Sequence, residues 1–212
     1  MRITVFGATG NVGRRVVAEA VERGHEVTAV GRDPARLADL PAGVETRAGD
    51  AARADDVAEL SAGQDLAIGA TRPPAGREGS LVTMAEALLA GAARTGVRLL
   101  LVGGAASLRV PDTGGLAVDD PRYVGAAWRD IALACCAQFE ACRKETGADW
   151  TYLSPPALLE PGDRTGRYRL GGDEMLLDGD GRSRISMEDF AVALLDEAER
   201  PRHRGARFTV AY

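Results

Sequence analysis

The residues most suggestive of chemistry form the segment Gly7–Gly13, which reads GATGNVG. It directly follows Arg2–Phe6, a short apolar run typical of a buried parallel strand. It also leads into an expected helix over residues 11–23, whose apolar positions have helical spacing. Glycines at such a turn let the backbone approach a diphosphate, and the first N–H groups of the helix attract anions. The pattern predicts a dinucleotide site, and a tight turn without a ligand is the alternative. The predicted contacts from this segment are Gly7, Thr9, Gly10, Asn11, Val12 and Gly13.

Residues that would select the coenzyme follow the second expected strand, Glu26–Gly31. At that point an acidic side chain binds the ribose hydroxyls of NAD, whereas an arginine accommodates the 2′-phosphate of NADP. Arg32 holds this position, and Asp33 is better explained as the N-cap of a short helix starting at Pro34. Arg14 could reach the same phosphate, because a guanidinium donates paired hydrogen bonds. We therefore expect NADP (NADPH), with NAD as the alternative. A solvated surface arginine is the alternative for both side chains.

Further coenzyme contacts are expected after the other strands, because ligands of such sheets lie beyond the carboxyl ends of the strands. Asp50 would bond the adenine amino group or merely cap the next helix. Ordered from the adenine to the nicotinamide, the expected contacts are Asp50, Ala51, Ala70, Thr71, Gly103, Gly104, Pro155, Pro156 and Ala157.

Two polar side chains are candidates for the reaction itself. Ser107 lies just past the fifth expected strand and could orient the carboxamide or the substrate, or be an ordinary loop serine. Tyr123 borders the long Gly- and Pro-rich stretch 103–125, and with Trp128 could form a platform for a flat substrate. For Trp128, core packing is the favoured interpretation. Tyr168 could close over the substrate from the C-terminal side.

The elements that must position these residues alternate between strand and helix. The periodicity predicts strands at 2–6, 26–31, 44–48, 65–70, 98–102, 150–154 and 207–210. Helices are expected at 11–23, 34–39, 55–60, 81–94, 126–146 and 186–199, the last opened by the capping box Ser186-x-x-Asp189. This order predicts an α/β fold with a Rossmann-type doubly wound parallel sheet. Residues 1–212 form a single domain, with 155–185 as a small C-terminal lobe on the substrate side.

Composition narrows the class of partner. The 212 residues carry a net charge of −5, which argues against nucleic acid as a partner. There is no membrane-length apolar run and no signal-peptide pattern, so we expect a cytoplasmic protein, monomer or homodimer, acting on a small molecule. The cysteines Cys135, Cys136 and Cys142 share one expected helix and have no histidine nearby. We expect packing rather than a redox role for them, and no metal site.

The glycine spacing of GATGNVG resembles the extended and atypical branches of the short-chain dehydrogenase/reductase superfamily. Further stretches, among them GRDPARL, LLLVGGAASL, DWTYLSPPALL and RFTVAY, resemble the NADH-flavin reductase-like proteins. They are also similar to biliverdin reductase B/flavin reductase and more distantly to NmrA-like proteins. Ala157 stands where biliverdin reductase B-like enzymes have a histidine, which disfavours a linear tetrapyrrole substrate.

The resemblance implies an NAD(P)H-dependent oxidoreductase that passes hydride to a flavin, a quinone or a similar conjugated acceptor. The Tyr-x-x-x-Lys dyad of typical members is missing: Tyr123 is followed four residues later by Ala127, and Glu140 precedes Lys144. An NmrA-like NADP(H) sensor without turnover is the alternative. An isomerase or ketoreductase is a third, which the missing dyad disfavours.

Overall fold

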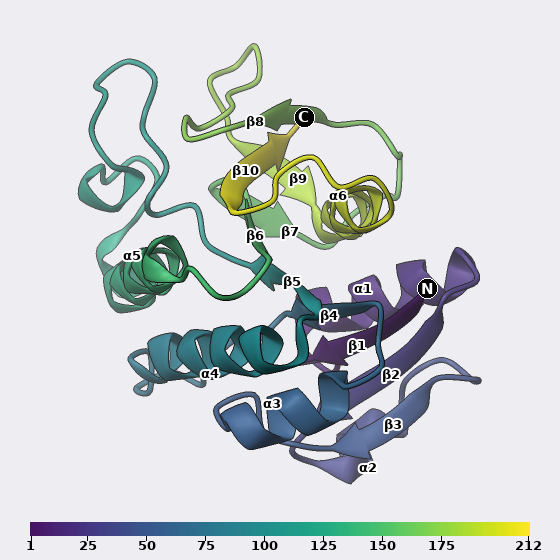
Figure 1. Ribbon diagram of the computed structural model, residues 1–212. Coiled ribbons are helices and arrows are strands. Elements are labelled where there is room, and N and C mark those ends of the chain that lie inside the picture. Colours follow the sequence, from purple (N-terminus) through teal and green to yellow (C-terminus); the bar gives the residue numbers. More distant parts are fainter.

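Eight strands form the central sheet of the protein, whose computed structural model describes residues 1–212 (Figure 1). Their order is β3-β2-β1-β4-β5-β6-β10-β8, and every neighbouring pair is parallel except β8 with β10. The strands are β1 (Arg2–Phe6), β2 (Glu26–Gly31), β3 (Glu45–Ala48), β4 (Leu66–Gly69), β5 (Arg98–Val102), β6 (Trp150–Ser154), β8 (Arg169–Gly171) and β10 (Ala206–Ala211).

The winding of the sheet reverses between β1 and β4. Ile3 of β1 pairs with Val27 of β2 on one side and with Leu66 of β4 on the other. The chain continues outward from this pair in both directions, which is the switch point of a doubly wound sheet. The Rossmann-type fold predicted from the sequence is therefore confirmed. Loops at the carboxyl ends of the two halves diverge here and leave a crevice for a ligand.

Helices cover both faces of the sheet (Figure 1). On one face α1 packs against α6, and on the other α4 packs between α3 and α5. Alternate residues of each strand serve the two layers: Leu100 of β5 belongs to the core under α1 and α6, whereas Leu99 and Leu101 belong to the opposite core. The helices are α1 (Asn11–Glu22), α2 (Pro34–Leu37), α3 (Ala54–Ser61), α4 (Ser80–Thr95), α5 (Arg129–Lys144) and α6 (Met187–Glu199).

Buried ion pairs join α1 to α6. Glu19 of α1 is 4% exposed and accepts hydrogen bonds from Arg23 at 2.7 Å and from Arg164 at 2.7 and 2.9 Å. Arg23 continues to Asp196 of α6 at 2.8 Å. Burial alone would raise the pKa of Glu19, but the hydrogen bonds from Arg164 and Arg23 outweigh it and lower that pKa.

The predicted boundaries of β1, β2, β5 and β6 agree with the structure. The helix predicted over 126–146 is different: residues 126–128 form a separate 3-10 turn, and α5 starts at Arg129. Within the C-terminal region, β7 (Leu158–Glu160) pairs in parallel with β9 (Arg184–Ser186) outside the main sheet. Ser186 then caps α6, its Oγ accepting a hydrogen bond from Asp189 N at 2.9 Å, so the predicted capping box is correct at its Ser side.

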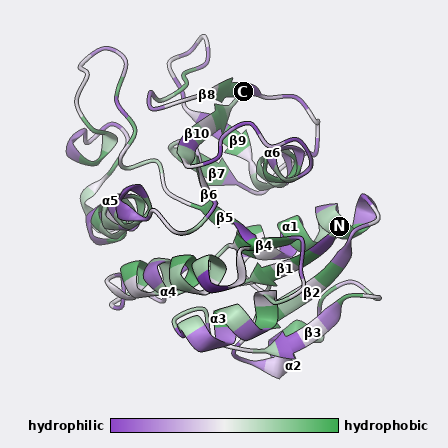
Figure 2. Cartoon of the chain, viewed as in Figure 1, coloured by the Kyte–Doolittle hydropathy of each residue, from purple (hydrophilic) through white to green (hydrophobic).

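The hydropathy of the chain follows this architecture. Figure 2 shows hydrophobic residues on β1, β4 and the inner side of α4, whereas β3 at the sheet edge is largely hydrophilic. None of the helices combines the length and the apolar character required to cross a membrane.

Candidate functional site

Close backbone packing in the turn after β1 requires glycine at the first and third glycine positions. Gly7 has a φ of 79°, and a Cβ there would lie 2.5 Å from the carbonyl oxygen of Ala70. A Cβ on Gly13 would lie 2.1 Å from the carbonyl oxygen of Gly7. Gly10 is freer, since its nearest neighbour would be the same oxygen at 3.3 Å. The turn is thus held tightly against the end of β4, and Gly10 is the position where a ligand could approach the backbone.

The amino end of α1 carries no side-chain cap. Its N-cap residue is Gly10, which has no side chain to accept the free N–H groups of the first turn. No acidic residue occupies that turn, and Arg14 donates to the carbonyl oxygen of Thr9 at 3.1 Å. A diphosphate would supply the missing acceptors, so the residues fit the predicted dinucleotide.

A cleft of about 500 Å³ adjoins this helix end, and its charged lining residues include three arginines and two carboxylates. Arg14 and Arg15 come from α1 and Arg36 from α2, and the carboxylates are Asp39 and Glu188. Arg15 is paired with Glu188 at 2.5 Å, whereas Arg36 has no ion pair. The sequence interpretation did not include Arg36, which lies on α2 four residues after Arg32.

Asp33, the second residue after β2, caps α2 as predicted. Asp33 accepts a hydrogen bond from Ala35 N at 3.0 Å and caps α2, so its carboxylate is engaged by the protein. Arg32 is exposed and forms no hydrogen bond or ion pair through its side chain. Arg32 therefore remains available to an anion, and its contact with a coenzyme stays a prediction.

Asp50 after β3 is engaged by its own loop. Its Oδ1 accepts from Ala52 N at 3.0 Å, and its N–H donates to Asp56 at 2.9 Å. This local turn accounts for the side chain without an adenine, while Ala51 beside it is buried in the core. A second acceptor oxygen of Asp50 has no protein partner, so the predicted adenine contact is still open.

The loop after β4 packs beside the glycine turn, whereas the loop after β5 packs against side chains of β6 and α5. Ala70 N donates to Phe6 O at 2.9 Å, which brings Ala70 and the following Thr71 beside the glycine turn. Gly103 and Gly104 accommodate side chains of the protein on the side where a Cβ would lie, and their predicted contact with a ribose stays a prediction. A Cβ on Gly103 would lie 2.1 Å from the Tyr152 ring, and one on Gly104 would lie 2.7 Å from Cys135.

Tyr152 of β6 lies against the glycines of the loop after β5, and it is enclosed. Its side chain is 0% exposed, its hydroxyl donates to Gln138 Oε1 at 2.9 Å, and it accepts from Gly104 N at 3.2 Å. Complete burial raises the pKa of Tyr152 well above its ordinary value. It is therefore not a proton donor for a bound substrate.

Ser107 does not point into open space. Its Oγ accepts from Arg207 of β10 at 2.8 Å and its carbonyl oxygen accepts from the same guanidinium at 3.1 Å. The Arg207 side chain is 5% exposed and also contacts Asp173 at 2.5 Å. This arrangement gives Ser107 a role in fixing the loop, and its predicted contact with substrate is not tested by the structure.

Tyr123 and Ala157 come together from two different loops. Both are half-buried and pack against one small apolar cluster of Leu108, Val110, Ala117 and Met175. Pro155 and Pro156, which precede Ala157, are buried. The cluster joins the stretch 103–125 to the C-terminal region 155–185, as expected for a substrate-side lobe.

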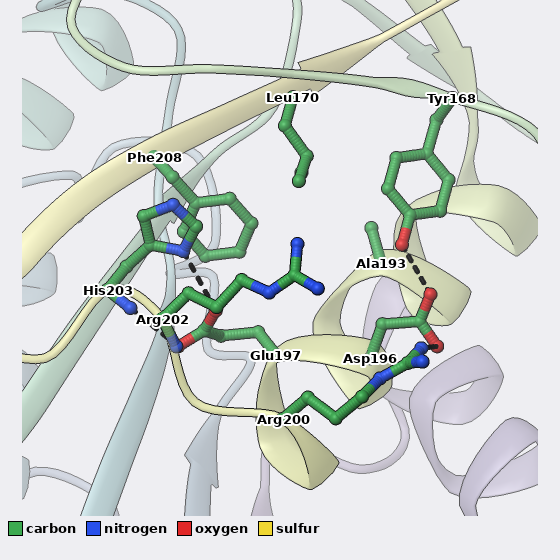
Figure 3. A pocket seen from close by; sticks show the side chains of 9 residues that line it. All are labelled: Tyr168, Leu170, Ala193, Asp196, Glu197, Arg200, Arg202, His203 and Phe208. Atoms are coloured by element: carbon green, nitrogen blue, oxygen red, sulfur yellow. Dashed lines mark hydrogen bonds and ion pairs between the residues drawn. The ribbon is translucent and has the colours of Figure 1, made fainter.

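Two aromatic side chains lie elsewhere than expected. Trp128 is 61% exposed, so the favoured interpretation of core packing is wrong, because the 3-10 turn breaks the phase of the predicted helix. Tyr168 packs over α6 and donates a hydrogen bond to Asp196, away from the predicted substrate side. It lines a separate pocket with His203 and Phe208, toward the amino end of β10 (Figure 3).

The cysteines are packed, as predicted. Cys142 is 0% exposed, and burial raises its pKa to about 12. Burial likewise raises the pKa of Cys135 to about 11. Thiols of this kind are poor nucleophiles at neutral pH, which argues against a redox role.

Comparison with known proteins gives the family of the chain. Residues 7–198 match a protein family described as NAD(P)H-binding. The chain is 34% identical over 218 residues to the uncharacterized protein YwnB of Bacillus subtilis, covering 99% of this chain and 98% of YwnB.

Two solved structures are similar over the whole fold. One from Burkholderia pseudomallei, provisionally described as an exported protein, is 38% identical with a TM-score of 0.89 and covers 100% of both chains. One from Streptococcus pneumoniae, provisionally described as an NADH-flavin reductase, is 30% identical with a TM-score of 0.86. It covers 100% of this chain and 99% of that one.

Proposed function

This chain belongs to the NAD(P)H-binding family, and we propose that it is an NADPH-dependent reductase that transfers hydride to a flavin, a quinone or a similar flat conjugated acceptor. The name given to the Streptococcus pneumoniae relative supports this class of acceptor. The uncapped amino end of α1 would hold the diphosphate, with Gly10 allowing close approach.

The preference for NADPH rests on the charges near the predicted ribose. Asp33, the only acidic side chain directly after β2, is engaged in capping α2. Arg32 has no partner in the protein, and Arg14 and Arg36 both line the adjoining cleft. Guanidinium groups favour a 2′-phosphate, whereas the Asp33 carboxylate is oriented toward the first turn of α2 by its capping hydrogen bond and so is less suited to the hydroxyls of an unphosphorylated ribose.

The observation that carries the class of acceptor is the sequestered Tyr152. Reduction of a simple ketone needs a proton donor at the developing alkoxide. The Tyr152 hydroxyl is buried and committed to Gln138, and Tyr123 lacks the lysine four residues later that would activate it for this task, since Ala127 stands there. The bound coenzyme would supply a hydride, which is a proton with two electrons, to N5 of a flavin, and water would supply the proton that completes reduction. Such an acceptor requires the protein chiefly to position two rings and to exclude water.

The residues available for that task are apolar and half-buried. Tyr123, Ala157, Ala105 and Leu177 pack on one cluster and present their remaining surface outward. A flat ring placed there would gain contact area on both loops. In this proposal Tyr123 binds the ring, and Ser107 keeps the loop in place through Arg207.

The test combines turnover with binding. We expect protein-dependent oxidation of NADPH when FMN or menadione is added, and faster turnover than with NADH. Arg36→Ala should weaken NADPH binding about tenfold or more with little effect on NADH, since a charged hydrogen bond contributes about 1.5–3 kcal/mol. Arg167→Ala is the matched control, because Arg167 is exposed and its side chain has no partner.

Two results would contradict the proposal. Tight NADPH binding without turnover of any acceptor would favour an NmrA-like sensor over a reductase. An equal loss of NADPH and NADH affinity in Arg36→Ala would remove the assignment of that side chain to the 2′-phosphate.

A further inference from the structure

Trp128 is the most exposed large apolar side chain of the protein. Its exposed fraction is 61%, whereas the other tryptophan, Trp150, is 5% exposed in the core. Leaving an indole in water forgoes the burial that normally stabilises it. An exposed aromatic ring at the edge of a candidate site is therefore a surface on which a ligand could stack.

The position of Trp128 is fixed by its neighbour. Arg129 donates to the carbonyl oxygen of Val118 at 2.8 Å and contacts Asp119 at 3.3 Å. These contacts hold the 3-10 turn Ala126–Trp128 against the stretch that follows β5. The ring is thus presented by an anchored turn at the start of α5.

Arg72 lies over one face of this ring. Its guanidinium carbon is 5.6 Å from the Trp128 ring centroid, and the side chain is exposed with no hydrogen bond or ion pair to any protein group. Arg72 comes two residues after Ala70, whose carbonyl oxygen abuts Gly7 of the glycine turn. The pair therefore lies at the rim of the crevice assigned to the coenzyme.

We propose that Arg72 and Trp128 form the outer part of the acceptor site, beyond Tyr123, and select a flat conjugated ring that carries an anionic group, of which the phosphate of FMN is an example. The inference rests on the proposed reductase function and names its class of substrate. The indole face would stack on the conjugated ring, and the unpaired guanidinium would pair with the anion. A cation without a carboxylate partner is complementary to an acidic substrate and not to a neutral one.

FMN and riboflavin provide a matched pair of probes, since they differ by the phosphate alone. We expect a kcat/KM for FMN roughly tenfold above that for riboflavin, the lower end of what a charge-assisted hydrogen bond provides, because the site is exposed. Arg72→Gln should reduce the FMN value to the riboflavin value and leave riboflavin unchanged. Trp128→Leu should lower both values by a similar factor, about five- to tenfold, because stacking does not involve the phosphate.

Binding gives a readout that does not depend on turnover. FMN should quench the tryptophan fluorescence of the wild-type protein, and most of that quenching should disappear in Trp128→Leu, because Trp150 is buried. Arg167→Gln is the control for loss of an exposed arginine. NADPH affinity should be measured for every variant, so that an effect on the coenzyme is separated from one on the acceptor.

Equal turnover of FMN and riboflavin by the wild-type protein would overturn this inference and leave the reductase function intact. Absence of turnover with every acceptor would reject the reductase, and fluorescence titration with FMN would still test the site. If Arg72→Gln weakens NADPH and leaves the FMN-to-riboflavin ratio unchanged, Arg72 belongs to the coenzyme and the inference fails. It also fails if Trp128→Leu only changes the oligomeric state.

Discussion

Replacing Arg207 by methionine should destabilise the protein strongly and loosen one half of the candidate site. The guanidinium donates to Ser107 Oγ and Ser107 O at 2.8 and 3.1 Å from a side chain that is 5% exposed. Each hydrogen bond from a buried charged donor contributes about 1.5–3 kcal/mol. The guanidinium also lies 4.2 Å from the Phe139 ring centroid, a contact that contributes about 0.5–2 kcal/mol.

The ion pair with Asp173 adds less, because that carboxylate is 72% exposed and exposed pairs contribute at most about 1 kcal/mol. Methionine retains part of the apolar stem but leaves the Ser107 carbonyl without its donor. We therefore expect Arg207→Met to lower the free energy of unfolding by about 3–5 kcal/mol. In a chain of this length that corresponds to a Tm lower by roughly 10 °C.

Urea denaturation and ligand titration together measure the effect. Because Ser107 belongs to the loop after β5, the variant should lose affinity for NADPH more than for 2′,5′-ADP, which lacks the nicotinamide half. Arg167→Met, which removes an exposed and unpartnered arginine, should change the free energy of unfolding by less than about 0.5 kcal/mol. Arg207→Lys should recover only part of the loss, since an ammonium cannot reproduce the paired donors.

A loss below about 1 kcal/mol in Arg207→Met would refute the energetic reasoning, because the Ser107 contacts would then be replaceable by water. Equal weakening of NADPH and 2′,5′-ADP would refute the positional reasoning, since it would indicate a change across the whole crevice.

Three further outcomes follow from packing and charge. Glu19→Gln should be less stable than wild type at neutral pH, yet its Tm should fall less on acidification. Because the pKa of Glu19 is lower in the folded protein, its stabilising effect is fully present above the unfolded-state pKa of about 4.5. That stabilisation is lost as the pH falls through the lower folded-state pKa, and the Gln variant has none to lose. A Tm profile parallel to that of wild type would contradict this. Gly13→Ala should lower the free energy of unfolding by more than about 2 kcal/mol and abolish NADPH binding, since its Cβ would lie 2.1 Å from Gly7 O. Gly172→Ala, where the added Cβ would meet open space, should leave the Tm nearly unchanged. Cys142 should stay unlabelled by iodoacetamide in the native protein at mildly alkaline pH, as mass spectrometry of peptides would report, because burial raises its pKa to about 12.

Local signals in the chain predicted much of the scaffold. The boundaries of β1 and the start of α1 at Asn11 follow from an apolar run that ends in glycines. Asp33 and Ser186 were identified as helix caps and both accept the expected backbone hydrogen bond. These features depend on residues within a few positions of one another, so sequence spacing is sufficient to predict them.

The candidate site was predicted less completely. Arg36 was not among the predicted contacts because only the folded chain brings it to the same cleft as Arg14. Trp128 was assigned to the core because a continuous helix over 126–146 would have given it apolar neighbours, but the break at Arg129 turns the ring outward. The residues that surround Arg36 and Trp128 in the folded protein could not be predicted from the local sequence.

By itself, then, the amino-acid sequence determined the alternation of strands and helices and the glycine turn expected for an NAD(P)H-binding protein. Only the tertiary structure decided that Ser107 is held by Arg207, a residue 100 positions away, and that Tyr152 is enclosed. The physical reason is that sheet order and register bring distant side chains together, and a one-residue change of register would exchange the two faces of a strand. Contacts of this range follow from packing of the whole domain and leave no periodic trace in the chain.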